Sequence, residues 1–190
     1  WFDGWSARHL PDDATTVICY ENSAVKTFQA ARERGITTIL DAASFHHRWQ
    51  DAFHEPVETD TVHATINRRK DEEIELADHI LTVSAFARES YVDAGVPPGQ
   101  VTSVPMGADL SAFTPASDHT SEGAEPFTFL FAGHAGRRKG VDVLLAASER
   151  LASAGHRHCL EFAGGANQGV FDNTDAPVKR LGYLDRANLA

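Results

Sequence analysis

The sequence is poor in cysteine and has no long apolar run, and these two absences exclude several classes of protein. Its 190 residues contain only two cysteines, Cys19 and Cys159, so a disulfide framework does not hold the chain together. No apolar stretch approaches the roughly 20 residues that cross a bilayer. The first residues lack the basic and then apolar pattern of a signal peptide. The chain does not start with methionine, and we expect it to be an internal piece of a longer protein.

Basic side chains are also scarce relative to acidic ones. The chain has 17 Lys and Arg against 27 Asp and Glu, for a formal net charge of −10. This balance argues against a nucleic-acid partner, because phosphate contacts need an excess of Lys and Arg. A small anionic ligand stays possible, since one pocket can be basic on an acidic protein. An acidic surface is typical of a soluble cytoplasmic protein, which is what we expect here.

The first half of the chain alternates between strand and helix patterns. Residues 15–20 and 36–40 are β-branched, apolar runs typical of strands buried on both faces, and residues 24–35 between them have helical spacing. Glu21, Asn22 and Ser23 offer side chains that could cap this helix. The pattern recurs as a charged helix over 65–78, strands over 79–83 and 101–104, and between these strands a helix over 85–94 with Ser84 as its N-cap. Strand–helix–strand successions with short joints predict a parallel sheet.

The charged helix carries acid and base at helical contact distance, which predicts that most of the run is a solvated face. Its charged residues are Arg68, Arg69, Lys70, Asp71, Glu72, Glu73 and Glu75.

The second half begins after a polar, turn-rich segment. Residues 107–126 have the composition of a linker. Strands are expected over 127–132, 159–163 and 178–181, and a helix is expected from Val141. The sequence therefore predicts two α/β segments joined by a hinge.

Two glycine-rich segments follow strands of this second half, where open α/β sheets bind ligands. The basic loop 133–140 precedes a helix, so its cations and the helix N–H groups could hold a phosphate, but a solvated turn fits equally well. Its glycine spacing matches neither a Walker A loop nor a dinucleotide fingerprint. Gly164 and Gly165 fit either a second ligand loop or a tight turn with positive φ.

Histidines are dense in two places, but their spacing fits no common metal site. The first group is His46, His47, His54 and His63, and the second is His156 and His158. We expect no metal. His46 follows the strand that ends near Asp41, so we expect it at the ligand-binding edge of the sheet.

Several motifs occur in an order that resembles one known family. They run from Glu73 through Ala77–Ile80, Val83–Ser84, Gly95–Val96, Val104–Pro105, Gly107, Asp109, Phe113 and Pro115 to Phe131–Gly133, Lys139–Asp142 and Leu144–Leu145. This succession resembles the GT4-type retaining glycosyltransferases, also called glycosyl transferases group 1. The resemblance covers nearly the whole chain and implies an α/β fold of GT-B type, with two Rossmann-like parallel-sheet lobes that are both incomplete here.

The resemblance also assigns each segment of the chain to a domain. Residues 1–107 would be the C-terminal part of the acceptor-side domain, 108–126 the linker, and 127–190 the first part of the nucleotide-sugar-binding domain. The family's N-terminal glycine-rich acceptor loop and its paired glutamates would lie outside this chain, so we expect the chain alone to be inactive.

Family roles map onto a few residues of this chain. His46 resembles a catalytic histidine that contacts the donor sugar, and Arg138 and Lys139 match the pair that holds the donor diphosphate. The remaining matches are Gly133, which lets the chain approach the diphosphate, Gly182 and Tyr183, which border the base, and Gly107 and Asp109 at the domain crossover. The sequence departs from the family at His134, where arginine is frequent, and at Met106, where asparagine is frequent.

The activity implied is transfer of a sugar from a nucleotide-sugar donor to a polysaccharide, glycolipid or small glycoside, with retention of configuration and with no cofactor or metal. The expected partners are therefore the nucleotide sugar and a sugar or lipid acceptor, with no nucleic acid. Peripheral association with the inner face of the membrane would come from the missing N-terminal part. A non-catalytic nucleotide-sugar-binding module of the same fold is the alternative.

Overall fold

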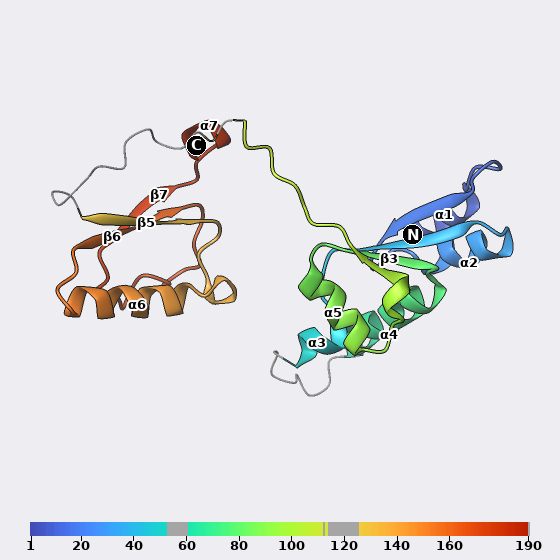
Figure 1. Cartoon of the computed structure of the whole chain (residues 1–190), viewed down its shortest axis with the longest axis horizontal. Coiled ribbons are helices and arrows are strands. Elements are labelled where there is room, and N and C mark those ends of the chain that lie inside the picture. Colours follow the sequence, from blue (N-terminus) through green and yellow to red (C-terminus); the bar gives the residue numbers. More distant parts are fainter. Residues whose placement is uncertain (53–60, 112, 114–125, 190) are drawn as a thin grey trace. The chain divides into compact units, whose positions relative to one another are not determined.

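The computed structural model describes residues 1–52, 61–111, 113 and 126–189. The chain divides into two compact units, Trp1–Gly107 and Ala108–Ala190 (Figure 1). The division falls where the expected linker begins, and most of that linker lies outside the described residues. No helix among the described residues is both long and apolar enough to cross a membrane.

The first unit is built on a four-stranded parallel sheet with the order β1-β2-β3-β4. Its strands are β1 (Thr16–Tyr20), β2 (Thr37–Ala42), β3 (His79–Thr82) and β4 (Val101–Ser103). Because all four strands run in one direction, their carboxyl ends share one edge of the sheet. The parallel sheet expected from the alternating pattern is therefore confirmed.

Helices connect these strands and close the core of the first unit. They are α1 (Phe2–Arg8), α2 (Val25–Glu33), α3 (His47–Asp51), α4 (Thr61–Leu76), α5 (Ala85–Asp93) and the 3-10 turn η1 (Pro98–Gln100). The buried core joins Phe28 of α2, Leu40 of β2, Ile80 of β3 and Tyr91 of α5. As expected, Ser84 caps α5, since its Oγ accepts a hydrogen bond from the Ala87 N–H at 3.0 Å. Helices α1 and α3 were not predicted.

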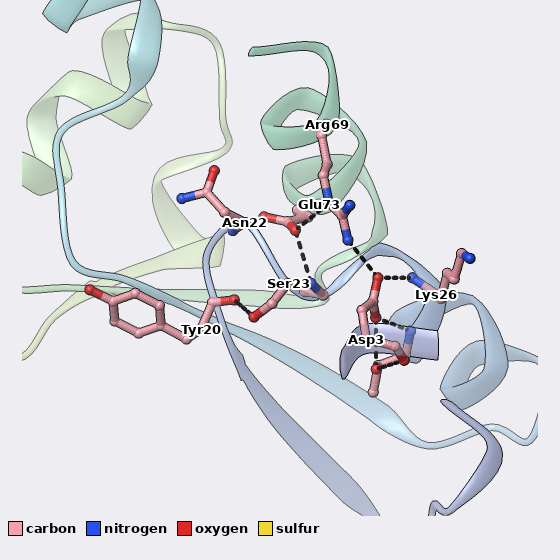
Figure 2. Close-up of polar contacts among 9 residues, drawn as sticks. Asp3, Tyr20, Asn22, Ser23, Lys26, Arg69 and Glu73 are labelled. Carbon is pink, nitrogen blue, oxygen red and sulfur yellow. Dashed lines mark hydrogen bonds and ion pairs between the residues drawn. The ribbon is translucent and has the colours of Figure 1, made fainter. Parts of the chain in front are cut away.

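Two buried carboxylates from distant elements cap the N-terminus of α2 (Figure 2). Asp3 of α1 accepts hydrogen bonds from the backbone N–H of Lys26 at 3.0 Å and of Thr27 at 2.9 Å. Glu73 of α4 accepts from the backbone N–H of Asn22 at 2.7 Å and of Ala24 at 2.9 Å. The partial positive charge of a helix N-terminus favours anions in this position.

Arg69 bridges the two carboxylates. Its Nη2 donates to Asp3 at 2.7 Å, and its Nε lies 3.6 Å from Glu73 Oε1. Burial raises the pKa of Glu73, while the two backbone N–H groups and the Arg69 charge oppose that rise. The bridging cation and the N–H donors offset the cost of burying the carboxylates.

This network corrects one sequence expectation and shows an exception to another. The cap of α2 does not come from residues 21–23, because its N-cap is Ala24 and no side chain at that position makes a capping bond in the described structure. Glu73 is the exception to the expectation that most of the charged run of α4 is solvated, because its side chain is 0% exposed.

The second unit contains a three-stranded parallel sheet with the order β5-β6-β7. Its strands are β5 (Phe127–Ala132), β6 (His158–Ala163) and β7 (Val178–Gly182). The 3-10 turn η2 (Arg137–Lys139) leads from β5 into α6 (Val141–Ser153), and α7 (Arg186–Leu189) follows β7. The structure thus has the two separate parallel sheets that the sequence predicts.

Helix α6 covers one face of this second sheet (Figure 1). Val141 and Leu145 pack with Leu160 and Phe162 of β6. A buried hydrogen bond of 2.7 Å between Ser148 Oγ and His158 Nε2 ties the helix to the same strand. The sheet also presents apolar side chains to solvent, since Phe127, Phe129 and Leu130 are 40 to 66% exposed.

We predict that Glu73→Ala lowers the free energy of unfolding by about 3 kcal/mol. The buried N–H of Ala24 and the part-buried N–H of Asn22 would lose their acceptor, and Arg69 would lose an ion-pair partner. Urea denaturation of the whole protein, followed by circular dichroism, measures this change. The matched control is Glu72→Ala, on the same helix but exposed, which should change stability by less than about 0.5 kcal/mol. Equal effects of the two substitutions would show that the capping network contributes little.

Candidate functional site

A cavity of about 370 Å³ lies at the carboxyl ends of the strands of the second unit. Strands β5, β6 and β7 end at Ala132, Ala163 and Gly182, and the cavity opens directly beyond them. Its lining consists of Ala132, Gly133, His134, Ala163, Gly164, Gly165, Tyr183, Leu184 and Leu189. Open parallel α/β sheets bind their ligands at this edge.

Backbone hydrogen bonds hold the floor of this cavity together. The Gly133 N–H donates to the Ala163 carbonyl at 2.8 Å, and the Gly164 N–H donates to the Gly182 carbonyl at 2.6 Å. Gly164 has φ +128, and a side chain there would collide with the carbonyl oxygen of Gly133. Gly164 is therefore required both by its conformation and by the close approach of the two loops.

The basic loop forms a turn beside the start of α6. Arg137, Arg138 and Lys139 make one exposed turn of 3-10 helix, and Gly140, with φ +69, redirects the chain into α6. No side chain of the described residues caps α6, so its first N–H groups are available to an anion. Arg138 and Lys139 are not part of the cavity lining, whereas Gly133 and Tyr183 are.

Gly182 and Tyr183 differ in what they contribute. Gly182 ends β7 with φ +72, and its carbonyl oxygen holds the Gly164 loop. Tyr183 is 88% exposed and lines the cavity, so its ring is free to contact a flat ligand group. Their assignment to the base stays a prediction.

Gly107 and Asp109 lie where the two units divide. Gly107 is the last residue of the first unit. Asp109 Oδ1 accepts a hydrogen bond from the Ser111 N–H at 2.9 Å, which shapes the chain locally.

His46, the expected catalytic residue, is the N-cap of α3 and is only 3% exposed. Its Nδ1 accepts a hydrogen bond from the Arg48 N–H at 3.2 Å, and its ring packs edge-on against Tyr91. Its backbone N–H donates to Ser90 Oγ at 3.0 Å. The ring also borders an open groove of about 450 Å³. These contacts give His46 a structural role that the sequence did not reveal, and its role in catalysis stays a prediction.

Burial lowers the pKa of His46 to about 4, and the neighbouring His47 and Arg48 charges act in the same direction. The imidazole is therefore neutral at pH 7. A neutral ring suits its task as a hydrogen-bond acceptor at the helix N-terminus.

His46, His47 and Asp71 bring potential metal ligands together, with ligand atoms within 4.8 Å of one another. Asp71 accepts from His47 Nε2 at 2.8 Å, and the Arg48 guanidinium donates to the same Asp71 oxygen at 3.3 Å. A cation would have to compete with Arg48 for this carboxylate, so we interpret the group as an ion-pair network. Histidine spacing alone could not find it, because α4 supplies Asp71. His54 lies outside the described residues.

Sequence reasoning also missed Asn167, which follows β6. Its Oδ1 lies 2.8 Å from His134 Nε2, so it fixes a side chain of the cavity lining. The two residues are 33 positions apart, and no motif connects them.

Comparison with known proteins finds the fold but no family. No family model matches the sequence, and no curated protein matches it significantly. Among solved structures, Anabaena HepE in complex with UDP is similar with a TM-score of 0.59 and 16% identity, over 90% of this chain and 50% of HepE. The lipopolysaccharide outer core galactosyltransferase WaaB is similar with a TM-score of 0.55 and 18% identity, over 97% of this chain and 47% of WaaB. TarM is similar with a TM-score of 0.60 and 11% identity, over 98% of this chain and 36% of TarM.

These neighbours are GT-B glycosyltransferases, and at such low identity the likeness shows the fold alone. The chain spans about half of their length or less. The GT-B type of fold, expected from the motif order, is therefore confirmed for the part that this chain covers.

The titration of His46 leads to a prediction about stability. An unfolded histidine takes up a proton below about pH 6.5, whereas folded His46 stays neutral until about pH 4. The free energy of unfolding should therefore fall as the pH decreases through this window. His46→Asn keeps an N-cap acceptor and should remove this part of the slope.

Urea denaturation between about pH 7 and about pH 4.5 tests this prediction. The control is His9→Asn, an exposed histidine of the same unit, which should keep the slope. An unchanged slope in the His46→Asn protein would contradict the prediction.

Proposed function

We propose that the protein to which this chain belongs transfers a sugar from a nucleotide-sugar donor to an acceptor. The observation that carries this proposal is the cavity beyond β5, β6 and β7, whose lining residue His134 is followed in the chain by a basic turn and by the uncapped N-terminus of α6. The presence of UDP in HepE, a protein of the same fold, supports it.

The arrangement separates the two chemical parts of such a donor. Leu184, Leu189 and the Tyr183 ring offer apolar and aromatic surface suited to a base. Arg138, Lys139 and the N–H groups of α6 offer positive charge suited to the diphosphate. The acidic protein would thus concentrate its cations where an anionic ligand needs them.

The proposed mechanism is electrostatic. The bond between the anomeric carbon of the donor sugar and the diphosphate oxygen breaks, and the acceptor hydroxyl oxygen forms the new bond to that carbon and releases its proton. Negative charge develops on the leaving diphosphate, and preorganised cations and N–H groups stabilise that charge. Lys139 supplies a compact charge and Arg138 a planar fork. This compensation needs no metal ion. Retention of configuration, as in the GT4-type enzymes, and a polysaccharide, glycolipid or small glycoside acceptor complete the proposal.

A non-catalytic nucleotide-sugar-binding module is the second candidate. The burial of His46 and its contacts with Arg48 and Tyr91 favour it, because they account for this histidine without any chemistry. Turnover separates the two candidates. If the full-length protein binds a nucleotide sugar but neither transfers nor hydrolyses it, the module is correct.

We predict that Lys139→Ala in the full-length protein weakens nucleoside diphosphate binding roughly 10- to 150-fold, since a charge-assisted hydrogen bond is worth about 1.5–3 kcal/mol. Calorimetric titration with UDP, ADP and GDP at fixed salt measures the affinity.

The matched control is Arg157→Ala. Arg157 is exposed and directly precedes β6, so it lies at the opposite, amino end of the sheet. Its removal changes the net charge equally and should leave the affinity unchanged. Equal weakening by both substitutions would point to a general charge effect and would remove the basic turn from the site.

A further inference from the structure

His134 and Asn167 form a polar pair in the wall of the cavity. His134 follows the end of β5 and lines the cavity, and Asn167 lies in the loop after β6. His134 Nε2 lies 2.8 Å from Asn167 Oδ1. The Asn167 backbone is itself fixed, because its N–H donates to the Ala135 carbonyl at 2.9 Å.

Two glycines leave room for this pair. A side chain at Gly136 would begin 2.7 Å from Asn167 Nδ2, and one at Gly165 would begin 3.0 Å from His134 Nδ1. Gly136 has an extended backbone with φ −169, and Gly165 does not have a positive φ. Space, rather than conformation, therefore favours glycine at these two positions, because a side chain there would displace the Asn167 amide or the His134 ring.

The hydrogen bond to Asn167 determines which nitrogen of His134 faces the cavity as an acceptor. An amide oxygen only accepts, so Nε2 carries the proton of the neutral ring, and Nδ1 carries the lone pair. The absent side chain of Gly165 leaves open the space in front of Nδ1, and Gly165 lines the same cavity. The wall thus presents a fixed acceptor to whatever binds there.

We propose that His134 Nδ1 accepts a hydrogen bond from a hydroxyl group of the bound nucleotide sugar, and that Asn167 is the positioning residue that orients the ring. A phosphate offers only acceptor oxygens near neutral pH, and the proposed function assigns the base, with its N–H donors, to the surface of Tyr183, Leu184 and Leu189. A ribose or sugar hydroxyl is then the matching ligand group. This inference rests on the proposed function and adds a specificity determinant to it.

The test uses the full-length protein and the nucleoside diphosphate that binds it best among UDP, ADP and GDP. Calorimetry compares this ligand with its 2′-deoxy and 3′-deoxy forms and with its glucose conjugate. His134→Phe keeps a ring without the acceptor, Asn167→Ala frees the ring, and Gly165→Ala covers Nδ1. Each should weaken binding about 3- to 10-fold, as expected for one neutral hydrogen bond.

The loss should depend on one hydroxyl. It should disappear for the deoxy form that lacks the partner hydroxyl, or it should occur only with the glucose conjugate. The double variant His134→Phe/Asn167→Ala should lose no more than the single variants.

Thr174→Ala is the control. Thr174 lies in the same loop as Asn167, but it donates a hydrogen bond to Glu149 of α6 at 2.6 Å and does not line the cavity. Its affinity should equal that of the wild type. No loss in the His134 and Asn167 variants, or an equal loss for all four ligands, overturns the inference while leaving the proposed function intact. Failure of the wild-type protein to bind any of these ligands overturns both.

Discussion

The close approach of two backbone segments, at Gly133 and Gly164, is the constraint on which the candidate site depends. The carbonyl of Gly133 occupies the position that a side chain at residue 164 would need. The Gly164 N–H donates to the Gly182 carbonyl, and the Gly133 N–H donates to the Ala163 carbonyl. These two hydrogen bonds connect the carboxyl ends of β5, β6 and β7 to one another. Because backbone segments form the floor of the cavity, that floor keeps its shape without relying on flexible side chains.

In the first unit, side chains rather than backbone groups satisfy the N–H groups at the start of a helix. Its helix α2 begins at a position that offers no capping side chain in the described structure, and carboxylates from α1 and α4 take over that role. Each carboxylate serves two backbone N–H groups, and Arg69 lies between them (Figure 2). The network therefore connects three helices through polar contacts where an apolar contact would leave N–H groups unsatisfied.

All the strands and the helices α2, α4, α5 and α6 were predictable from the sequence because their signals are local. The strand over 127–132, the cap at Ser84 and the order of strands and helices follow from periodicity and from residues adjacent in the chain. The basic turn and the glycines at the strand ends were also found, since their residue types are visible in sequence. The GT-B type of fold came from the order of the motifs.

Apart from the short helices α1 and α3, the missed features depend on residues that are distant in sequence. In the sequence, Glu73 resembles the solvated charges around it, and only the packing of α4 against α2 buries it. Asp71 contacts His47 through the packing of α4 as well. The partnership of Asn167 with His134 needs the register of β5 against β6. No local pattern records such contacts, because tertiary packing decides which polar groups lose their water and need partners.

The ion pair between Asp3 and Arg69 joins residues 66 positions apart. Because synthesis proceeds from the N-terminus, the backbone N–H groups at Asn22 and Ala24 must stay hydrated until residue 73 has left the ribosome. Closing so long a loop costs chain entropy before any contact repays it. Helices α1, α2 and α4 therefore cannot complete their shared polar contacts until α4 has been synthesised. We expect the first unit to fold as one late, cooperative event rather than helix by helix.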